Sequence, residues 1–336
     1  MPNYVYFLLA VAALIVGYII YGGIVTRVFG VQPSRATPAQ THADGVDYVE
    51  MPVWKVWLVQ LLNIAGVGPV FGPILGALWG PSALLWIVIG TIFAGAVHDY
   101  MSGMLSIRYG GANVPTFVGY NLGSAAKQIM RVFAVVLLIL VGVVFVAAPA
   151  ALLAKLTPSA LNLTFWVCVI FAYYFLATIM PIDKIIGRIY PFFAILLLFM
   201  ALGLLAALLL NPQYSILPNL RPADFFTNLN PKGAPLWPLL FVTIACGAIS
   251  GFHATQSPLM TRCMESEKHG RMLFYGPMIA EGVLGLIWVT LGLSFYESPE
   301  ALGAVIKAGT PTLVVQEISM ALLGPIGGML AILGVV

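Results

Sequence analysis

The feature that most constrains this chain is a cluster of glycine and proline inside a hydrophobic segment. Residues 63–81 read NIAGVGPVFGPILGALWGP, and five helix-breaking residues fall within eight positions, namely Gly66, Gly68, Pro69, Gly72 and Pro73. Proline removes an amide donor and clashes with the preceding turn, and glycine lowers helix stability. We therefore expect a membrane helix that is interrupted within the bilayer. Because freed backbone groups cannot face lipid, the break must be buried in protein or line a wet cavity; the alternative is a kink that lets helices pack closely.

The composition is that of a protein that crosses the membrane several times. Of the 336 residues, 61% are hydrophobic and only 8% are charged, whereas soluble domains contain about 25% charged residues. The net charge of +3 gives no reason to expect a nucleic-acid partner. Cys168, Cys246 and Cys263 have neither metal nor redox spacing. We therefore expect the lipid bilayer as a partner, no metal site and no cofactor.

Hydropathy predicts nine membrane segments in an all-α fold. A spanning helix needs about 20 apolar residues, and no segment alternates like an outer-membrane barrel strand. The predicted segments lie at about 4–26, 56–79, 83–107, 131–152, 161–180, 189–210, 236–258, 273–296 and 313–336.

Lysine and arginine residues predict the orientation of these segments. Eleven of them follow odd-numbered segments and four follow even-numbered ones. Cytoplasmic loops carry the excess of positive charge, so we expect the N-terminus to lie outside.

The seventh segment repeats the anomaly of the second. Residues 245–258 read ACGAISGFHATQSP and contain Gly247, Gly251 and Pro258 among several polar side chains. Paired interrupted segments in two halves of a chain are the best sequence indication of a transporter binding site. Because the two segments are five apart, they cross the membrane in opposite directions, as an inverted repeat of five helices requires.

This count divides the chain into three parts. Residues 1–55 are expected to form an N-terminal transmembrane helix and a cytoplasmic loop, and 56–235 a first five-helix repeat with an outer loop. Residues 236–336 then start an inverted second repeat that the chain does not complete. We therefore expect association either with a missing C-terminal portion or with further copies in a homo-oligomer.

Four ionisable residues fall inside predicted membrane segments, where charge is costly and indicates function. His98 and Asp99 lie in the third segment, His253 in the seventh and Glu281 in the eighth. Asp99, His253 and Glu281 each lie nine or ten residues from an arginine at the expected cytoplasmic end of the same helix, which is ~14 Å of depth in a helix. The shared depth predicts one site or a relay. Because histidine changes charge near neutral pH, we expect these four residues to couple transport to protons, or to another monovalent cation.

Each of these residues also has a purely structural interpretation. His98 can hydrogen-bond a neighbouring carbonyl, and Asp99 can pair with Arg108, nine residues along the same helix. Glu281 is followed by Gly282 and Gly285, so it can mark a tight contact between helices.

The two breaks supply the residues that we expect to bind a small-molecule substrate. They are glycine or polar residues, together with one aromatic residue inside the first break: Asn63, Gly66, Gly68, Phe71, Gly72, Ser250, Gly251, His253, Thr255 and Gln256.

At these positions the chain resembles the carbon starvation protein A (CstA) family. The resemblance rests on residues 63–81, on 95–108 (GAVHDYMSGMLSIR) and on 250–258 (SGFHATQSP), and it extends along the whole chain. It implies a multi-pass protein of the bacterial inner membrane from the amino acid/polyamine/organocation superfamily, with a LeuT-like fold of two inverted five-helix repeats. It also implies uptake of peptides or pyruvate in carbon starvation by proton symport. Members of the family are usually longer than this chain.

Three function classes follow from these observations. The first is a secondary active transporter of small carboxylate-bearing nutrients, with no catalytic residues. The second is a sensor or scaffold that has a transporter fold but moves no solute. The third is an intramembrane serine hydrolase, because Ala248-Ile-Ser-Gly251 approaches a Gly-x-Ser-Gly motif. However, its first residue is alanine, and His253 lies only three residues beyond Ser250 in the same broken segment, whereas a base must be correctly oriented toward its nucleophile.

Overall fold

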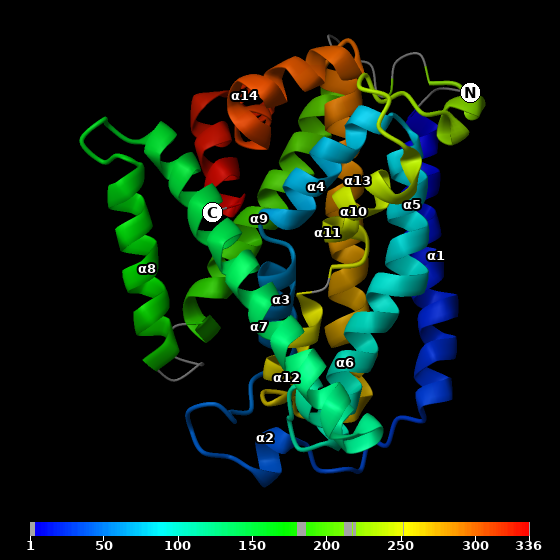
Figure 1. Cartoon of the computed structure of the whole chain (residues 1–336), viewed down its shortest axis with the longest axis vertical. Coiled ribbons are helices and arrows are strands. Elements are labelled where there is room, and N and C mark those ends of the chain that lie inside the picture. Colours follow the sequence, from blue (N-terminus) through cyan, green and yellow to red (C-terminus); the bar gives the residue numbers. More distant parts are fainter. Residues whose placement is uncertain (1–3, 180–185, 212–216, 218–219, 251, 336) are drawn as a thin grey trace.

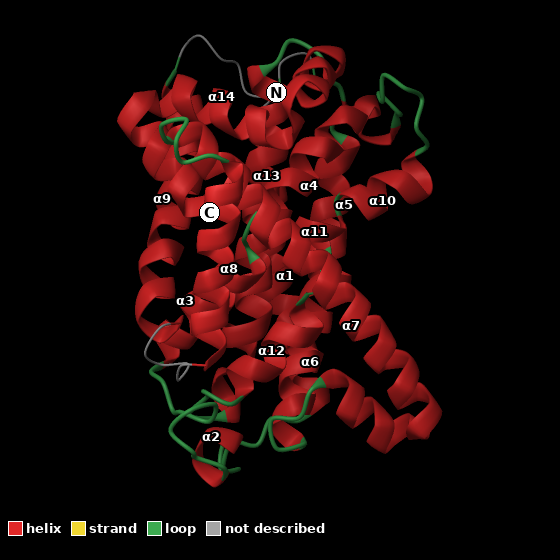
Figure 2. Cartoon of the chain, turned by 60° about the vertical axis from the view of Figure 1, so that its left-hand side comes forward, coloured by secondary structure: helices red, strands yellow, loops and turns green. Residues whose placement is uncertain are grey.

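The chain is a bundle of helices in the computed structural model, which describes residues 4–179, 186–211, 217, 220–250 and 252–335 (Figure 1). No strand occurs in these ranges (Figure 2), so the predicted all-α class is confirmed. The α-helices are α1 (Tyr4–Phe29), α2 (Pro38–Thr41), α3 (Val53–Ile64), α4 (Gly68–Gly76), α5 (Ser82–Gly90), α6 (Ala96–Arg108), α7 (Val114–Leu156), α8 (Leu163–Ile179), α9 (Ile186–Leu210), α10 (Phe241–Thr243), α11 (Ala245–Ala248), α12 (His253–Thr261), α13 (Gly276–Phe295) and α14 (Pro299–Val335). Shorter 3-10 and π-helical turns are η1 (Ala77–Trp79), η2 (Thr91–Gly95), η3 (Pro222–Phe226), η4 (Leu236–Leu240), η5 (Glu267–His269) and η6 (Arg271–Tyr275).

Within the described residues, six helical stretches are long and apolar enough to cross a membrane, and the bent pair formed by α3 and α4 makes a seventh. All nine predicted segments overlap helical residues. However, α8 has only 17 residues, and the segment predicted at 236–258 is divided among short helices. The count of nine crossings therefore remains a prediction. The six stretches are Tyr4–Phe29, Ser82–Arg108, Val114–Leu156, Tyr190–Leu210, Glu267–Phe295 and Pro299–Gly334.

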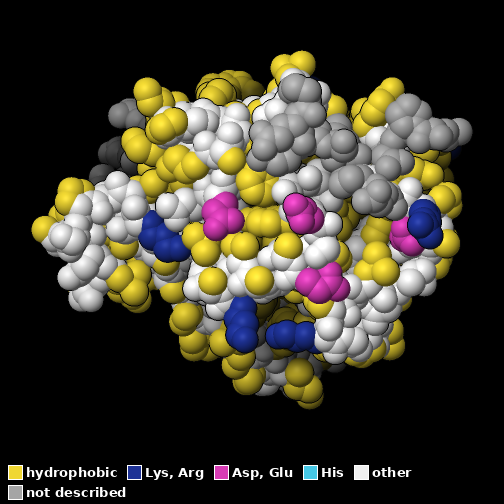
Figure 3. All heavy atoms as spheres, turned by 90° about the horizontal axis from the view of Figure 1, so that it is seen from above, with side chains coloured by type: hydrophobic (Ala, Val, Ile, Leu, Met, Phe, Trp, Pro, Cys, Tyr) yellow, Lys and Arg dark blue, Asp and Glu magenta, His cyan; other side chains and the backbone are white. Residues whose placement is uncertain are grey.

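The helices differ strongly in burial, which separates a central helix from peripheral ones. Within an 18-residue apolar window of the stretch that includes α13, 78% of the residues are buried, against 11% in the corresponding windows of α1 and α7. Helix α8 stands at the left of the bundle in Figure 1, next to α7, which runs obliquely toward α12, and no residue of α8 is buried. Exposed apolar helix surfaces of this kind are what lipid contact requires. From above, acidic and basic side chains are scattered among hydrophobic ones (Figure 3).

The first break lies where the glycine and proline residues predict it. α3 ends at Ile64 and α4 begins at Gly68, and the helix axes differ by 47°. Pro69 is tolerated there because it is the second residue of α4, where an amide has no partner within the helix.

The second break begins within α11, whose backbone is non-helical at Cys246 and Gly247, and ends where α12 begins. Its backbone has positive φ at Gly247 (+102°) and at Ser250 (+37°). Such conformations suit glycine and are uncommon for other residues, so Gly247 is required for the turn.

The two broken segments lie side by side and run antiparallel. Gln60 on α3 donates to Ser257 on α12 at 3.1 Å. Farther along the first segment, a Cβ at Gly72 would lie only 2.8 Å from the carbonyl oxygen of Cys246, and Gly76 packs on Ile244. As the residue number rises along the first segment, the number of its contact residue in the second segment falls, so the two segments run in opposite directions. This is the relationship that an inverted pair requires, while the five-helix repeats themselves remain a proposal.

A buried carboxylate holds together the end of the molecule that carries α2. Glu267 is fully buried, 3.4 Å from the guanidinium of Arg108 and 3.6 Å from that of Arg35. It also accepts the backbone N–H of Gln32 at 2.9 Å. One side chain therefore joins the loop after α1, the end of α6 and the turn before α13.

Candidate functional site

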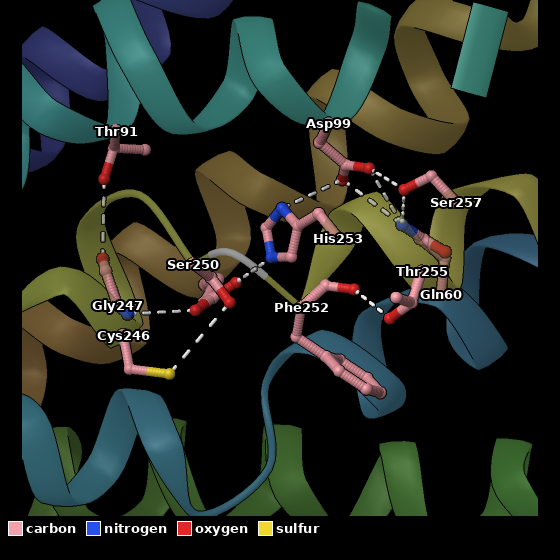
Figure 4. Close-up of polar contacts among 11 residues, drawn as sticks. Gln60, Thr91, Asp99, Cys246, Gly247, Ser250, Phe252, His253, Thr255 and Ser257 are labelled. Carbon is pink, nitrogen blue, oxygen red and sulfur yellow. Dashed lines mark hydrogen bonds and ion pairs between the residues drawn. The ribbon is translucent and has the colours of Figure 1, made fainter. Parts of the chain in front are cut away.

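His253, the first residue of α12, lies between two carboxylates (Figure 4). Its Nε2 is 3.0 Å from Oε2 of Glu281 on α13, and its Nδ1 is 3.6 Å from Oδ2 of Asp99 on α6. All three side chains are fully buried. The fold thus brings together three of the four ionisable residues that the sequence places at one depth. We call His253, Asp99 and Glu281 the buried triad.

Asp99 is held by neutral donors from both broken segments. Gln60 Nε2 lies 3.1 and 3.2 Å from its two carboxylate oxygens, and the hydroxyl of Ser257 donates to Oδ1. Because an isolated buried carboxylate is very costly, these dipoles are what allow Asp99 to lie inside the bundle. The suggested pair with Arg108 does not form, since that guanidinium contacts Glu267.

Glu281 stabilises the backbone of the second break. Its Oε1 accepts the backbone N–H of Gly247 at 3.0 Å, while Oε2 faces His253. The carbonyl of Gly247 in turn accepts the hydroxyl of Thr91 at 3.5 Å. Side chains from α13 and η2 therefore satisfy backbone groups that the break has freed, as the interior of a membrane protein demands.

The tight helix contact suggested for Glu281 also exists, one residue farther along α13. A Cβ at Gly282 would lie 2.7 Å from the hydroxyl oxygen of Thr91. Packing and polar contact are therefore both present at this turn, and the interpretation as a packing position does not replace the one as a titratable group.

The buried triad places a titratable ring between two carboxylates. Nε2 of His253 is hydrogen-bonded to Glu281, whereas Nδ1 lies 3.6 Å from Asp99 and makes no hydrogen bond with the described residues. Buried charges are stable only when they are paired and hydrogen-bonded. A change in the protonation of His253 therefore changes the electrostatic balance of the break itself.

His98 lies beside the triad. Its ring is stacked on that of His253 with centroids 6.3 Å apart, and it is half-buried. Its Nδ1 is buried and has no hydrogen-bond partner among the residues that the structure describes, so the suggested bond to a carbonyl is not made there. This buried nitrogen therefore has a hydrogen-bonding capacity that the described residues do not use.

The residues expected from the first break fall into two groups. Asn63 and Gly66 line a cavity of about 440 Å³, and Asn63 Nδ2 donates to the carbonyl of Val59 at 2.8 Å. Gly68 and Gly72 instead face the other broken segment, where they pack on Cys246. Phe71 is half-buried against the hydrophobic core.

The polar side chains of the second break differ in their contacts and in their burial. Thr255 donates to the carbonyl of Phe252 at 2.8 Å, and Gln256 is 5% exposed. Ser250 is buried, with its hydroxyl 4.0 Å from the sulfur of Cys246. Its described contacts do not include His253, which is the pairing that a serine hydrolase needs. Gly251 lies outside the described residues.

The polar network also contains four residues that were not among the expected binding residues: Gln60, Ser257, Thr91 and Gly247. Gln60 had a signal in the sequence, because it is a lone amide within the apolar run VWLVQLL of residues 56–62. Ser257 had a weaker one, as the last polar residue before Pro258. Within the described part of the chain, no group of three His, Cys, Asp or Glu residues could hold a metal ion.

Comparisons of the sequence with a family profile and with known proteins agree on one family. The sequence profile described as carbon starvation protein CstA matches residues 3–165 and 146–322. A Haemophilus influenzae protein described as an uncharacterized membrane protein is 49% identical, over 90% of this chain and 94% of that protein.

Two relatives with transport names are more distant and longer. The peptide transporter CstA of Campylobacter jejuni is 28% identical, over 83% of this chain and 48% of that protein. The pyruvate/proton symporter BtsT of Escherichia coli is 26% identical, over 79% of this chain and 45% of that protein. The chain therefore spans about half the length of these transporters. No solved structure matches it.

Proposed function

Because the chain belongs to the carbon starvation protein CstA family, we propose that it is a secondary active transporter that takes up small carboxylate-bearing nutrients. The observation that carries the proposal is the buried triad, in which His253 bridges Asp99 and Glu281 at a break in a membrane helix. Ionisable groups inside a membrane protein indicate ion or substrate pathways. Transport names among the relatives support the same class.

Proton coupling is the mechanism that this geometry supports best. In the proposed cycle, His253 gains a proton when the site is open to one side and passes it on when the site is open to the other. His98, stacked on His253, serves as the neighbouring proton carrier. The break moves with this exchange, since Glu281 binds both His253 and the backbone of Gly247.

We propose that the substrate's carboxylate is bound by the half-helix ends at the two breaks. α4 begins at Gly68 and α12 begins at His253, and the N-terminal end of a helix carries partial positive charge. The relatives are named for peptides and for pyruvate. We propose that this chain takes up one of these two solutes during carbon starvation. Alternating access would come from movement of residues 56–235 against residues 236–336.

We place the chain in the bacterial inner membrane with its N-terminus outside. Arg35 and Arg108 meet at Glu267, and Arg262 donates to the carbonyl of Gly111 near the same end. These arginines were all assigned to the cytoplasm by the excess of positive charge, and their meeting at one end of the bundle supports that assignment.

Uptake into proteoliposomes tests the proposal. Labelled pyruvate and a labelled dipeptide are offered with and without an inward proton gradient, to the wild-type chain and to His253→Ala. Gradient-driven accumulation of one solute that the variant loses is the expected result. Accumulation that needs sodium but no proton gradient would assign a different coupling ion. Binding without accumulation would instead support a sensor with a transporter fold.

A further inference from the structure

A cavity lies between the α7–α8 pair and the core of the bundle, next to the first break. Its volume is about 440 Å³, and its walls come from α3, α7, α8, α9 and the end of α14. Pockets for drug-sized ligands have volumes of about 300–1,000 Å³. The cavity is therefore much larger than a three-carbon acid needs.

The lining of the cavity is aromatic and uncharged. Among the residues that the structure describes, six aromatic side chains contribute to it, and none of the described lining residues is Asp, Glu, Lys, Arg or His. A carboxylate placed against these residues would find no charged partner among them, which is unfavourable where it leaves water. An apolar group has no such penalty. The aromatic residues are Phe145, Trp166, Tyr173, Tyr174, Tyr190 and Phe193.

Some polar groups of the lining are already engaged, which leaves the walls apolar. The hydroxyl of Tyr174 donates to the carbonyl of Phe145 at 3.1 Å. The indole nitrogen of Trp166 donates to the hydroxyl of Thr157 at 3.0 Å. Asn63 uses its amide nitrogen within α3, and its amide oxygen remains as an acceptor beside the break.

One wall of the cavity packs against the residue that precedes His253 of the buried triad. The ring of Phe145 stacks on that of Phe252 with centroids 5.8 Å apart, and Phe252 immediately precedes His253. A Cβ at Gly66 would lie 2.8 Å from the Phe145 ring, so only glycine lets this ring sit on the first break. A ligand group in the cavity therefore lies one aromatic layer away from the residues proposed to carry protons.

We infer that this cavity binds the apolar side chain of a peptide substrate, and that it favours aromatic and large aliphatic side chains. The inference rests on the proposed transport function and adds to it the class of substrate: a short peptide with a hydrophobic residue, rather than pyruvate. The peptide's charged termini remain outside the cavity, at the breaks.

Calorimetric binding of two dipeptides to the full chain in nanodiscs tests this inference. Ala-Phe is expected to bind at least about ten-fold more tightly than Ala-Ala, because burying the phenyl group removes apolar surface from water. Ile170 lines the cavity, so Ile170→Trp fills it from α8 and should abolish the preference by lowering the affinity for Ala-Phe to that for Ala-Ala. Leu176→Trp is the matched control, since Leu176 lies on the same helix, is 54% exposed and does not line the cavity. Val169→Phe, at a neighbouring lining position, replaces Ile170→Trp if that variant does not fold.

The outcomes separate this inference from the transport proposal. Equal affinities for the two dipeptides, no binding of either one, or equal losses in Ile170→Trp would overturn the inference. If proteoliposomes accumulate both dipeptides equally well, the transport proposal stands and the inference fails. If Ala-Phe binds with the expected preference and neither peptide accumulates, the inference stands and the transport proposal fails.

Discussion

The Nε2 of His253 lies 3.0 Å from Oε2 of Glu281, and neither side chain is accessible to solvent. The second oxygen of Glu281 accepts the backbone N–H of Gly247 inside the break. One carboxylate therefore connects a titratable ring to the conformation of a broken membrane helix. This connection gives a physical route from proton binding to movement of the helix ends.

Glu281→Gln tests that route. The glutamine amide oxygen can still accept the N–H of Gly247, so we expect the break to keep its shape, but the side chain can no longer carry a charge beside His253. Gradient-driven accumulation in proteoliposomes should be lost, while exchange of labelled for unlabelled substrate at equal concentrations continues.

Glu317→Gln is the control for this substitution. Glu317 lies on α14 and accepts the hydroxyl of Tyr296 at 2.9 Å, so its replacement should leave accumulation unchanged. Full gradient-driven accumulation in Glu281→Gln would show that the carboxylate serves only to hold the break.

Ser257→Ala removes one of the neutral donors to Asp99. Because the loss of one partner leaves a buried charge less well solvated, the free energy of unfolding should fall by about 1–3 kcal/mol. Thermal unfolding of the detergent-solubilised protein measures this as a lower Tm. Thr178→Ala, which removes a 2.8 Å bond to the carbonyl of Tyr174 on the exposed helix α8, should change the Tm little. Equal Tm values for the two variants would contradict the role given to Ser257.

Hydropathy and helix breakers predicted much of the fold because both act locally. The break at Gly66 and Gly68 follows from backbone chemistry alone, and so does the second break at Gly247. The path of the predicted last segment was not foreseen. α14 has non-helical backbone at Gly309 and Thr310, which precede the predicted segment, and at Gly324 within it. One glycine in an apolar run is a weak signal of a break, because it lowers helix stability by only about 1 kcal/mol.

The site was less predictable because its partners come from different helices. Depth along each helix correctly suggested that Asp99, His253 and Glu281 could meet. It did not indicate which side chains would surround Asp99, since that depends on how α3 and α12 rotate about their axes. Phe71 illustrates the same limit: its place inside the break predicts substrate contact, but only the structure shows that one side of its ring packs on the hydrophobic core, and the contact itself stays a prediction.

Gly72→Ala tests the close packing of the two broken segments. The added methyl group would lie 2.8 Å from the carbonyl oxygen of Cys246 and 2.9 Å from that of Thr243. Because these are backbone atoms, the helices must separate, and overpacking of this kind costs about 1–3 kcal/mol. A clearly lower Tm is expected.

Gly142→Ala is the matched control for Gly72→Ala. Gly142 lies within α7, and a Cβ there would meet nothing within 4 Å. Alanine also favours the helix more than glycine does, so the Tm should stay the same or rise. A Tm for Gly72→Ala as high as that of Gly142→Ala would mean that the segments are not packed as closely as described.

Glu267→Gln should loosen the end of the bundle that carries α2. The substitution keeps an acceptor for the backbone N–H of Gln32 but removes the charge that faces Arg35 and Arg108. Because both arginines are partly exposed, we expect a modest loss of about 1–2 kcal/mol in the free energy of unfolding.

We also expect faster hydrogen exchange of backbone amides in the loop that contains Gln32, measured by mass spectrometry. Glu265→Gln, two residues away and half-buried, should leave that exchange unchanged. If exchange in the loop is as slow in Glu267→Gln as in the wild type, the contacts of α2 and its flanking loop, rather than this carboxylate, hold that end closed.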